Sequence, residues 1–82
     1  MSEEFEEGKV KFLDVVKGVD PAVGVVIPVT PSRGNFLIAL TKGKARKFIS
    51  VNEDDIVDLA HDSDILRKVT EEVQLAIAEI SA

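Results

Sequence analysis

The sequence contains no cysteine, tryptophan or tyrosine and only one histidine among its 82 residues. Without cysteine the chain can form no disulfide and can offer no thiol nucleophile, iron–sulfur ligand or zinc–thiolate site, and this composition suits a reducing compartment. The absence of tyrosine and tryptophan leaves four phenylalanines as the aromatic side chains on which a nucleic-acid base could stack. We therefore expect a protein without a cofactor.

Long apolar runs are also absent. The longest nearly unbroken one, residues 22–29, contains Gly24 and Pro28, whereas a helix needs about 20 apolar residues to cross a bilayer. The first seven residues carry four glutamates, where a signal peptide would be basic. We expect a cytoplasmic protein without membrane contact, in which residues 1–8 form a flexible acidic tail and residues 9–82 a single domain.

Acidic residues are missing from the middle of the chain. Residues 1–20 carry a net charge of −3, residues 21–52 carry five bases and no acid, and residues 53–82 carry a net charge of −7. Such an uneven distribution favours self-association or a charged partner. It is equally consistent with an internal match, in which acidic helices lie over a basic hairpin.

Three segments in the middle of the chain predict an antiparallel meander. Residues 23–29 form an apolar run, and residues 36–41 are apolar on both faces, as in a central strand. A tight hairpin at Gly43, which can supply the positive φ of a short loop, leads to a third strand over 45–51. The connection 30–35 has proline and glycine where a type I turn accepts them.

Helical patterns follow the meander. Asn52 is a good N-cap for a short acidic helix that reaches about residue 60, and residues 64–80 carry apolar side chains at spacings of three and four. Residues 10–16 suit either a strand or a short helix, and their β-branched content favours a fourth strand. The sequence thus predicts an α+β domain, with an antiparallel sheet of three or four strands covered on one face by the C-terminal helix.

His61 is the first place to look for catalysis or metal binding, because Asp55, Asp58, Asp62 and Asp64 lie close to it in the sequence. A helix would place some of these carboxylates on one face with the imidazole. The glycine and distal glutamate of a calcium-binding loop are absent, and no serine or threonine stands in a nucleophile motif. Solvated helix ends and caps explain the same residues, so we predict no metal site, no catalytic residue and a non-enzymatic protein.

Basic residues in the middle segment suit contacts with phosphate if the two turns project from the same end of the sheet. Phe48 beside Arg46 is the best stacking pair. Overall acidity argues against this function, and basic residues at a hairpin tip more often keep a turn soluble and guard a sheet edge. The candidate contacts with an anion or nucleic acid are Arg33, Lys42, Lys44, Arg46 and Lys47.

One long helix can cover only one face of the predicted sheet, which leaves a second, partly apolar face. Small domains often bury such a surface in a homodimer. We therefore predict a protein–protein interaction module that self-associates or binds another protein, with nucleic-acid or anion binding through the basic hairpin 33–47 as the alternative. The candidate interface residues are Leu37, Ala39, Phe48, Leu75 and Ile77.

Overall fold

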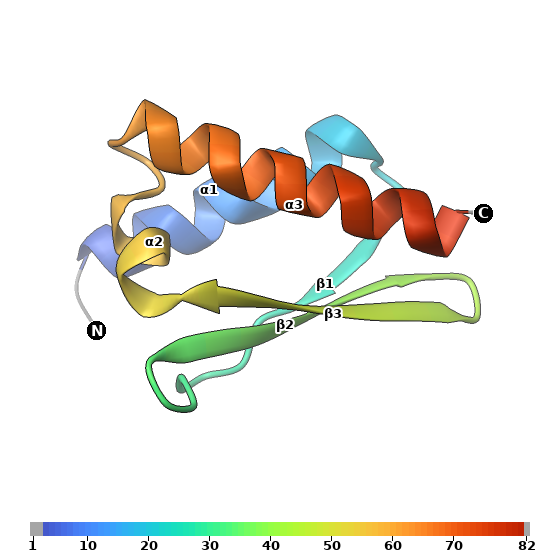
Figure 1. Ribbon diagram of the computed structural model, residues 1–82, viewed down its shortest axis with the longest axis horizontal. Helices are drawn as coiled ribbons and strands as arrows, with labels where there is room; N and C mark the ends of the chain where they lie inside the picture. Colours follow the sequence, from blue (N-terminus) through green and yellow to red (C-terminus); the bar gives the residue numbers. More distant parts are fainter. Residues whose placement is uncertain (1–2, 82) are drawn as a thin grey trace.

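The structure, a computed structural model, describes residues 3–81. These residues form six elements, in the order α1 (Glu3–Val19), β1 (Gly24–Val26), β2 (Asn35–Lys42), β3 (Ala45–Asn52), α2 (Glu53–Asp58) and α3 (Ser63–Ser81). The strands make an antiparallel sheet in the order β1-β2-β3, and the helices lie together on one side of it (Figure 1). The predicted α+β class is confirmed, with three strands and not four.

The segment predicted as a fourth strand, residues 10–16, lies inside α1, so that prediction is wrong. The buried residues of α1 are Phe5, Gly8, Phe12 and Val16, about one per turn. This apolar stripe begins five residues before the segment that suggested a strand. Packing of the stripe against the core outweighs the β-branched residues, whose effect on helix propensity is small.

The first two turns of α1 occupy most of the predicted flexible tail. Residues 3–8 are helical, and their glutamates lie at the positive end of the helix dipole, where negative charge is favourable. The predicted boundary at residue 9 therefore falls inside a helix. Residues 1–2 of that tail lie outside the described part of the chain.

Strand β1 is shorter than predicted and lies at an edge of the sheet. Only Gly24–Val26 of the apolar run pairs with β2, and the run is not buried on both faces, because Gly24 and Val26 are exposed and Val25 is half-buried. Pro28 follows the strand. Because proline has no backbone N–H to donate to a neighbouring strand, it fits a position outside the paired part of the sheet.

The turn between β1 and β2 differs in type from the prediction. Ser32 and Asn35 exchange two backbone hydrogen bonds, of 2.8 and 3.1 Å, across a loop of two residues. Both loop residues have positive φ, 54° at Arg33 and 78° at Gly34, which defines a type I′ turn and not type I. The turn orients the chain directly into β2.

The β2–β3 hairpin is the longest paired unit and agrees with the prediction. Its strands pair without interruption from Asn35 and Asn52 to Lys42 and Ala45. Gly43 has a φ of 60°, as expected for the first residue of a type II′ loop. Alternate residues of β2 therefore point into the helical layer or away from it.

Helix α2 begins at the predicted cap Asn52, and α3 begins directly after Asp62. The Asn52 side chain accepts a hydrogen bond from the Asp54 backbone N–H at 2.8 Å, and Asp62 accepts one from the Asp64 N–H at 2.9 Å. Helix α3 extends one residue beyond each end of the predicted 64–80. Its buried stripe, packed towards the sheet, consists of Val69, Val73, Ala76 and Ile77.

The core lies between the helices and one face of the sheet. Helices α1 and α2 approach most closely at Gly8, where a β-carbon would lie 1.8 Å from the carbonyl oxygen of Ile56. That oxygen belongs to the backbone and cannot rotate away. Gly8 thus allows two helices to pack in contact.

We predict that Gly8→Ala lowers the free energy of unfolding by about 1 to 3 kcal/mol, the usual cost of overpacking, although alanine normally favours a helix. Gly18→Ala is the matched control, because a β-carbon there meets no atom within 4 Å. It should leave stability unchanged or raise it by up to about 1 kcal/mol. Urea unfolding measures both, and equal effects of the two substitutions would contradict the close contact.

Candidate functional site

The uncovered face of the sheet carries a cluster of apolar side chains. Val26, Ala39 and Phe48 lie directly opposite one another on the three strands, and Leu37 lies in the next row. Val26, Leu37 and Phe48 are 62%, 56% and 49% exposed, and Ala39 is covered between them. We call these four residues the open-face cluster. Three of them were predicted, and Val26 was missed because its place depends on the register between β1 and β2.

The outward side chains of the strands include the apolar open-face cluster, the polar residues Thr41 and Ser50, and the cation Arg46. No carboxylate lies on it, because residues 21–52 contain none. Arg46 points to the same side, and its guanidinium carbon lies 6.0 Å from the centre of the Phe48 ring, within cation–π distance. The face could therefore contact an apolar surface or stack against a planar group.

The other two predicted interface residues lie on α3 and have different surroundings. Ile77 is buried in the core, so its prediction as a surface contact is wrong. Leu75 is 70% exposed. At 3.6 residues per turn it lies about 40° around the helix from Glu79, whose carboxylate contacts Lys47 of β3 at 2.8 Å. Leu75 therefore projects from the same flank of α3 as Glu79, but it points away from the sheet, because it lies about 200° around the helix from the buried Val73.

Four of the five predicted basic residues lie at the end of the β2–β3 hairpin that carries its loop, and Arg33 does not. Two of the four, Lys42 and Lys47, bind carboxylates outside the sheet, Asp20 at 2.6 Å and Glu79 at 2.8 Å. Arg33 lies in the turn that enters β2, whereas the β2–β3 hairpin tip follows the other end of β2. The two turns thus project from opposite ends of the sheet, contrary to the condition set for a phosphate site. Two of the five basic residues, Lys42 and Lys47, thus form ion pairs within the chain.

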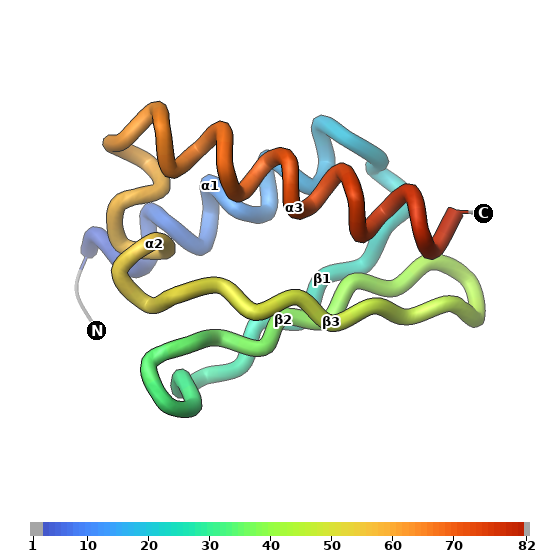
Figure 2. The backbone as a smooth tube through the Cα atoms, viewed as in Figure 1, coloured from blue at the N-terminus to red at the C-terminus, as the bar shows by residue number. Residues whose placement is uncertain are grey.

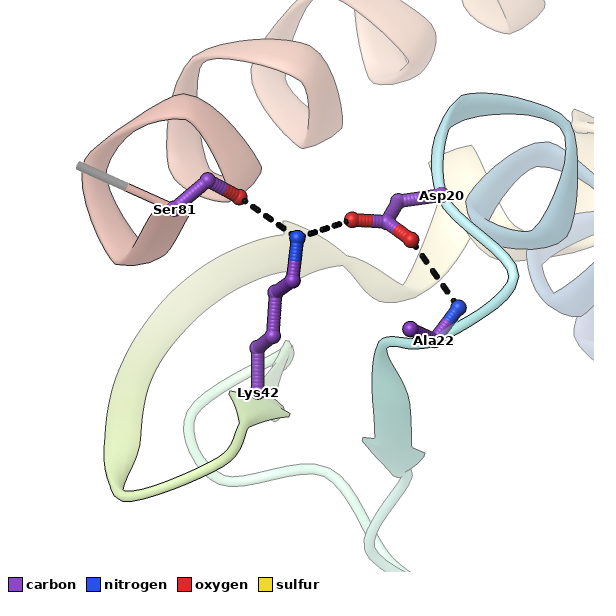
Figure 3. A network of polar contacts seen from close by, with 4 residues as sticks. All are labelled: Asp20, Ala22, Lys42 and Ser81. Carbon is purple, nitrogen blue, oxygen red and sulfur yellow. Dashed lines mark hydrogen bonds and ion pairs between the residues drawn. The ribbon is translucent and has the colours of Figure 1, made fainter.

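Lys42 ties the end of the hairpin to both long helices (Figure 3). Its ammonium donates to Asp20 Oδ2 at 2.6 Å, in the turn after α1, and to Ser81 Oγ at 3.3 Å, at the end of α3. Asp20 Oδ1 also accepts a hydrogen bond from the Ala22 N–H at 2.9 Å. The hydrogen bond from Lys42, followed by that from Ala22, lowers the pKa of the Asp20 carboxyl.

His61 does not gather the nearby aspartates. Its Nε2 lies 2.8 Å from Glu7 Oε2, and both side chains are more than half exposed. Asp55 instead binds Lys68, and that hydrogen bond raises the pKa of the lysine. Asp64 contacts Arg67. Within residues 3–81, no three His, Asp or Glu side chains are grouped so as to hold a metal ion.

Together the fold and this surface define a two-layer α+β domain with one uncovered sheet face. Comparison with known proteins adds no relative, since no protein family, curated protein or solved structure matches the chain. Among the helices of residues 3–81, none combines the length and apolar character that a membrane span requires. The exposed side chains of the sheet and of α3 therefore provide the basis for a proposed function.

We predict that the ion pair in Figure 3 makes stability depend on acid pH. Because folding lowers the pKa of Asp20 from its usual 3.8, the ionised carboxylate stabilises the folded state above that value, and the contribution disappears as the pH falls through the folded pKa. Asp20→Asn should therefore be less stable than the unmodified protein near neutral pH.

In urea unfolding the difference should stay constant above about pH 5 and narrow as the pH falls below 3.8 through the folded-state pKa, because both proteins then carry an uncharged side chain at this position. Asp14→Asn is the control, since no ion pair holds that carboxylate in residues 3–81. A difference for Asp20→Asn that does not change with pH would contradict the role of its charge.

Proposed function

We propose that this chain is a small non-enzymatic interaction module that self-associates as a homodimer, with Phe48 at the centre of the contact. The observation that carries the proposal is the exposure of large apolar side chains on two adjoining surfaces. Val26, Leu37 and Phe48 project from the open face, and Leu75 projects from the flank of α3 beside β3. Burial of each such side chain contributes about 1.5 to 3 kcal/mol, which favours a partner.

Phe48 belongs to both surfaces because β3 is an edge strand. The side of the molecule formed by β3 and α3 faces the viewer in Figures 1 and 2 and spans the two longest dimensions, 35 and 25 Å. The open face is narrower, because it consists of three strands whose outer two lie about 10 Å apart. A standard interface buries about 800 Å² per partner, so the broader side supports a stable dimer better than the open face alone.

Charge also favours a second copy of this chain as the partner. Residues 1–20 and 53–82 carry all fifteen acids, whereas the charged residues of 21–52 are all basic. Lys44 and Arg46 have no ion pair within residues 3–81. A second copy supplies the missing carboxylates together with apolar side chains. We place this function in the cytoplasm, because a chain without cysteine suits a reducing compartment.

Nucleic-acid binding is the second candidate, and the Arg46–Phe48 pair on the open face is what favours it. Stacking on such a pair is tolerant of sequence and is accompanied by strong salt dependence. Lys42 and Lys47 contribute little to this function because both are bound to acids of the helical segments. We therefore rank it below self-association.

We predict that Phe48→Lys and Leu75→Lys each raise the Kd of the homodimer at least tenfold. The lysine ammonium retains its water in the contact, and the loss of one buried apolar side chain exceeds the roughly 1.4 kcal/mol that corresponds to a factor of ten. Val10→Lys is the matched control, since Val10 is 58% exposed on α1. Sedimentation equilibrium gives the Kd values, and circular dichroism checks that each variant is folded.

Two results would contradict self-association at this surface. One is an unmodified protein that stays monomeric at every concentration, and the other is a Val10→Lys variant that weakens the dimer as much as Phe48→Lys. A monomer that binds a short mixed-sequence RNA at low salt and releases it at high salt would favour the second candidate instead.

A further inference from the structure

The outer edge of β3 is an unpaired strand edge. One side of β3 pairs with β2 over all eight residues, and no other strand of residues 3–81 lies beside it. The two-residue hairpin loop makes Lys42 and Ala45 a hydrogen-bonded pair, and such pairs alternate along the ladder. The backbone N–H and C=O groups of Arg46, Phe48 and Ser50 therefore point outward.

Features that normally block such an edge are weak in β3. The strand contains no proline, and its one-to-one register with β2 contains no bulge. A charged lysine at a strand edge discourages pairing with another strand. The charge of Lys47 is instead directed towards helix α3, where it forms the ion pair with Glu79. Arg46 lies over the ring of Phe48. The edge is thus long, regular and available for pairing.

Helix α3 lies above this edge and carries an apolar side chain on the same side. Two ion pairs attach α3 to the neighbouring elements. Lys47 of β3 pairs with Glu79, and Asp55 of α2 pairs with Lys68. Leu75 lies between these two points along the helix. Glu79 and Lys68 have partners within the chain. Glu72 lies seven residues before Glu79, on the same flank, and has no ion pair within residues 3–81. A strand added to β3 would bring its own helical layer against Leu75.

We propose that β3 pairs antiparallel with β3 of a second copy across a two-fold axis at Phe48, which joins two three-stranded sheets into one of six strands. This inference rests on the proposed self-association and names its geometry. Outward backbone groups of Arg46, Phe48 and Ser50 then form the central hydrogen bonds of the joined sheet. The helices of both copies lie on the same face, where the two Leu75 side chains approach each other.

The register follows from the side chains. With Phe48 opposite Phe48 of the second copy, each Arg46 lies opposite a Ser50, and the two arginines are about 13 Å apart along the strands. Lys44 then lies opposite Asn52 of the second copy, next to the acidic first turn of α2 that begins at Glu53. A register centred on Arg46 would place like charges opposite each other, which is destabilising. The Phe48 register pairs the aromatic rings and matches the charges.

Ser50→Pro tests the backbone pairing directly. Proline removes the outward N–H of Ser50 but is tolerated at an outward position of an edge strand, and it leaves Phe48 and Leu75 in place. We expect it to raise the homodimer Kd at least tenfold, whereas the control Ser50→Ala, which keeps the N–H, changes it less than threefold. Sedimentation equilibrium measures the Kd, and circular dichroism with urea unfolding checks the fold.

Amide hydrogen exchange of the unmodified protein provides a test that needs no variant. Raising the concentration through the Kd should slow exchange at Arg46, Phe48 and Ser50 at least tenfold more than at Lys47 and Ile49, whose N–H groups already bond to β2. Uniformly fast exchange at the three outward amides in the dimer would overturn the edge pairing.

The two proposals fail in different ways. A dimer that persists in Ser50→Pro but dissociates in Phe48→Lys would overturn edge pairing and leave self-association through the open face in place. An unmodified protein without a dimer would overturn both.

Discussion

The contact between the helical layer and the inward face of the sheet is the interaction on which the rest of the structure depends. Phe36, Ile38 and Leu40 point inward from the central strand and are fully or almost fully buried, as are Phe12 of α1 and Val73 of α3. Helices pack on one face only. Residues 3–81 cover one face in this way and leave the opposite face and the outer edge of β3 without cover. These are the surfaces on which the proposed self-association depends.

Charge distribution follows the same division into layers. The acids lie in the helical segments and the bases of residues 21–52 in and beside the sheet, and two ion pairs, Lys42 with Asp20 and Lys47 with Glu79, join the layers. An internal match and a charged partner are therefore compatible explanations of the charge asymmetry. The internal match accounts for Lys42 and Lys47, whereas Arg33, Lys44 and Arg46 have no ion pair within residues 3–81.

Local periodicity was sufficient to predict α3 and the β2–β3 hairpin, because their patterns are complete within one segment. It failed for α1, since a window that starts at Val10 omits Phe5, the residue that makes the spacing to Phe12 helical. The type I′ turn could not be predicted, because Arg33 adopts a positive φ that such residues rarely take. The hydrogen-bonded pair of Ser32 with Asn35, which closes the turn, became visible only in three dimensions.

The candidate surface was predictable in part for the same reason. Alternation along β2 and β3 placed Leu37 and Phe48 on the face away from the helix, but Val26 joins them only through the register of β1. Ile77 follows Val73 by four residues on the buried stripe of α3. This spacing is a signal for the core, and the prediction of Ile77 as an interface residue did not take it into account. Leu75 lies off the stripe, and its nearness to β3 depends on the contact between Glu79 and Lys47.

We propose that the side formed by β3 and α3 contacts a second copy of the chain. A nuclear Overhauser measurement on a mixture of ¹³C-labelled and unlabelled protein, filtered to record only contacts between copies, tests this contact directly. We expect intermolecular signals that connect Phe48 to Phe48 and Leu75 to Leu75. Intermolecular signals confined to α1, for example at Val10, or no such signals at millimolar concentration, would contradict it.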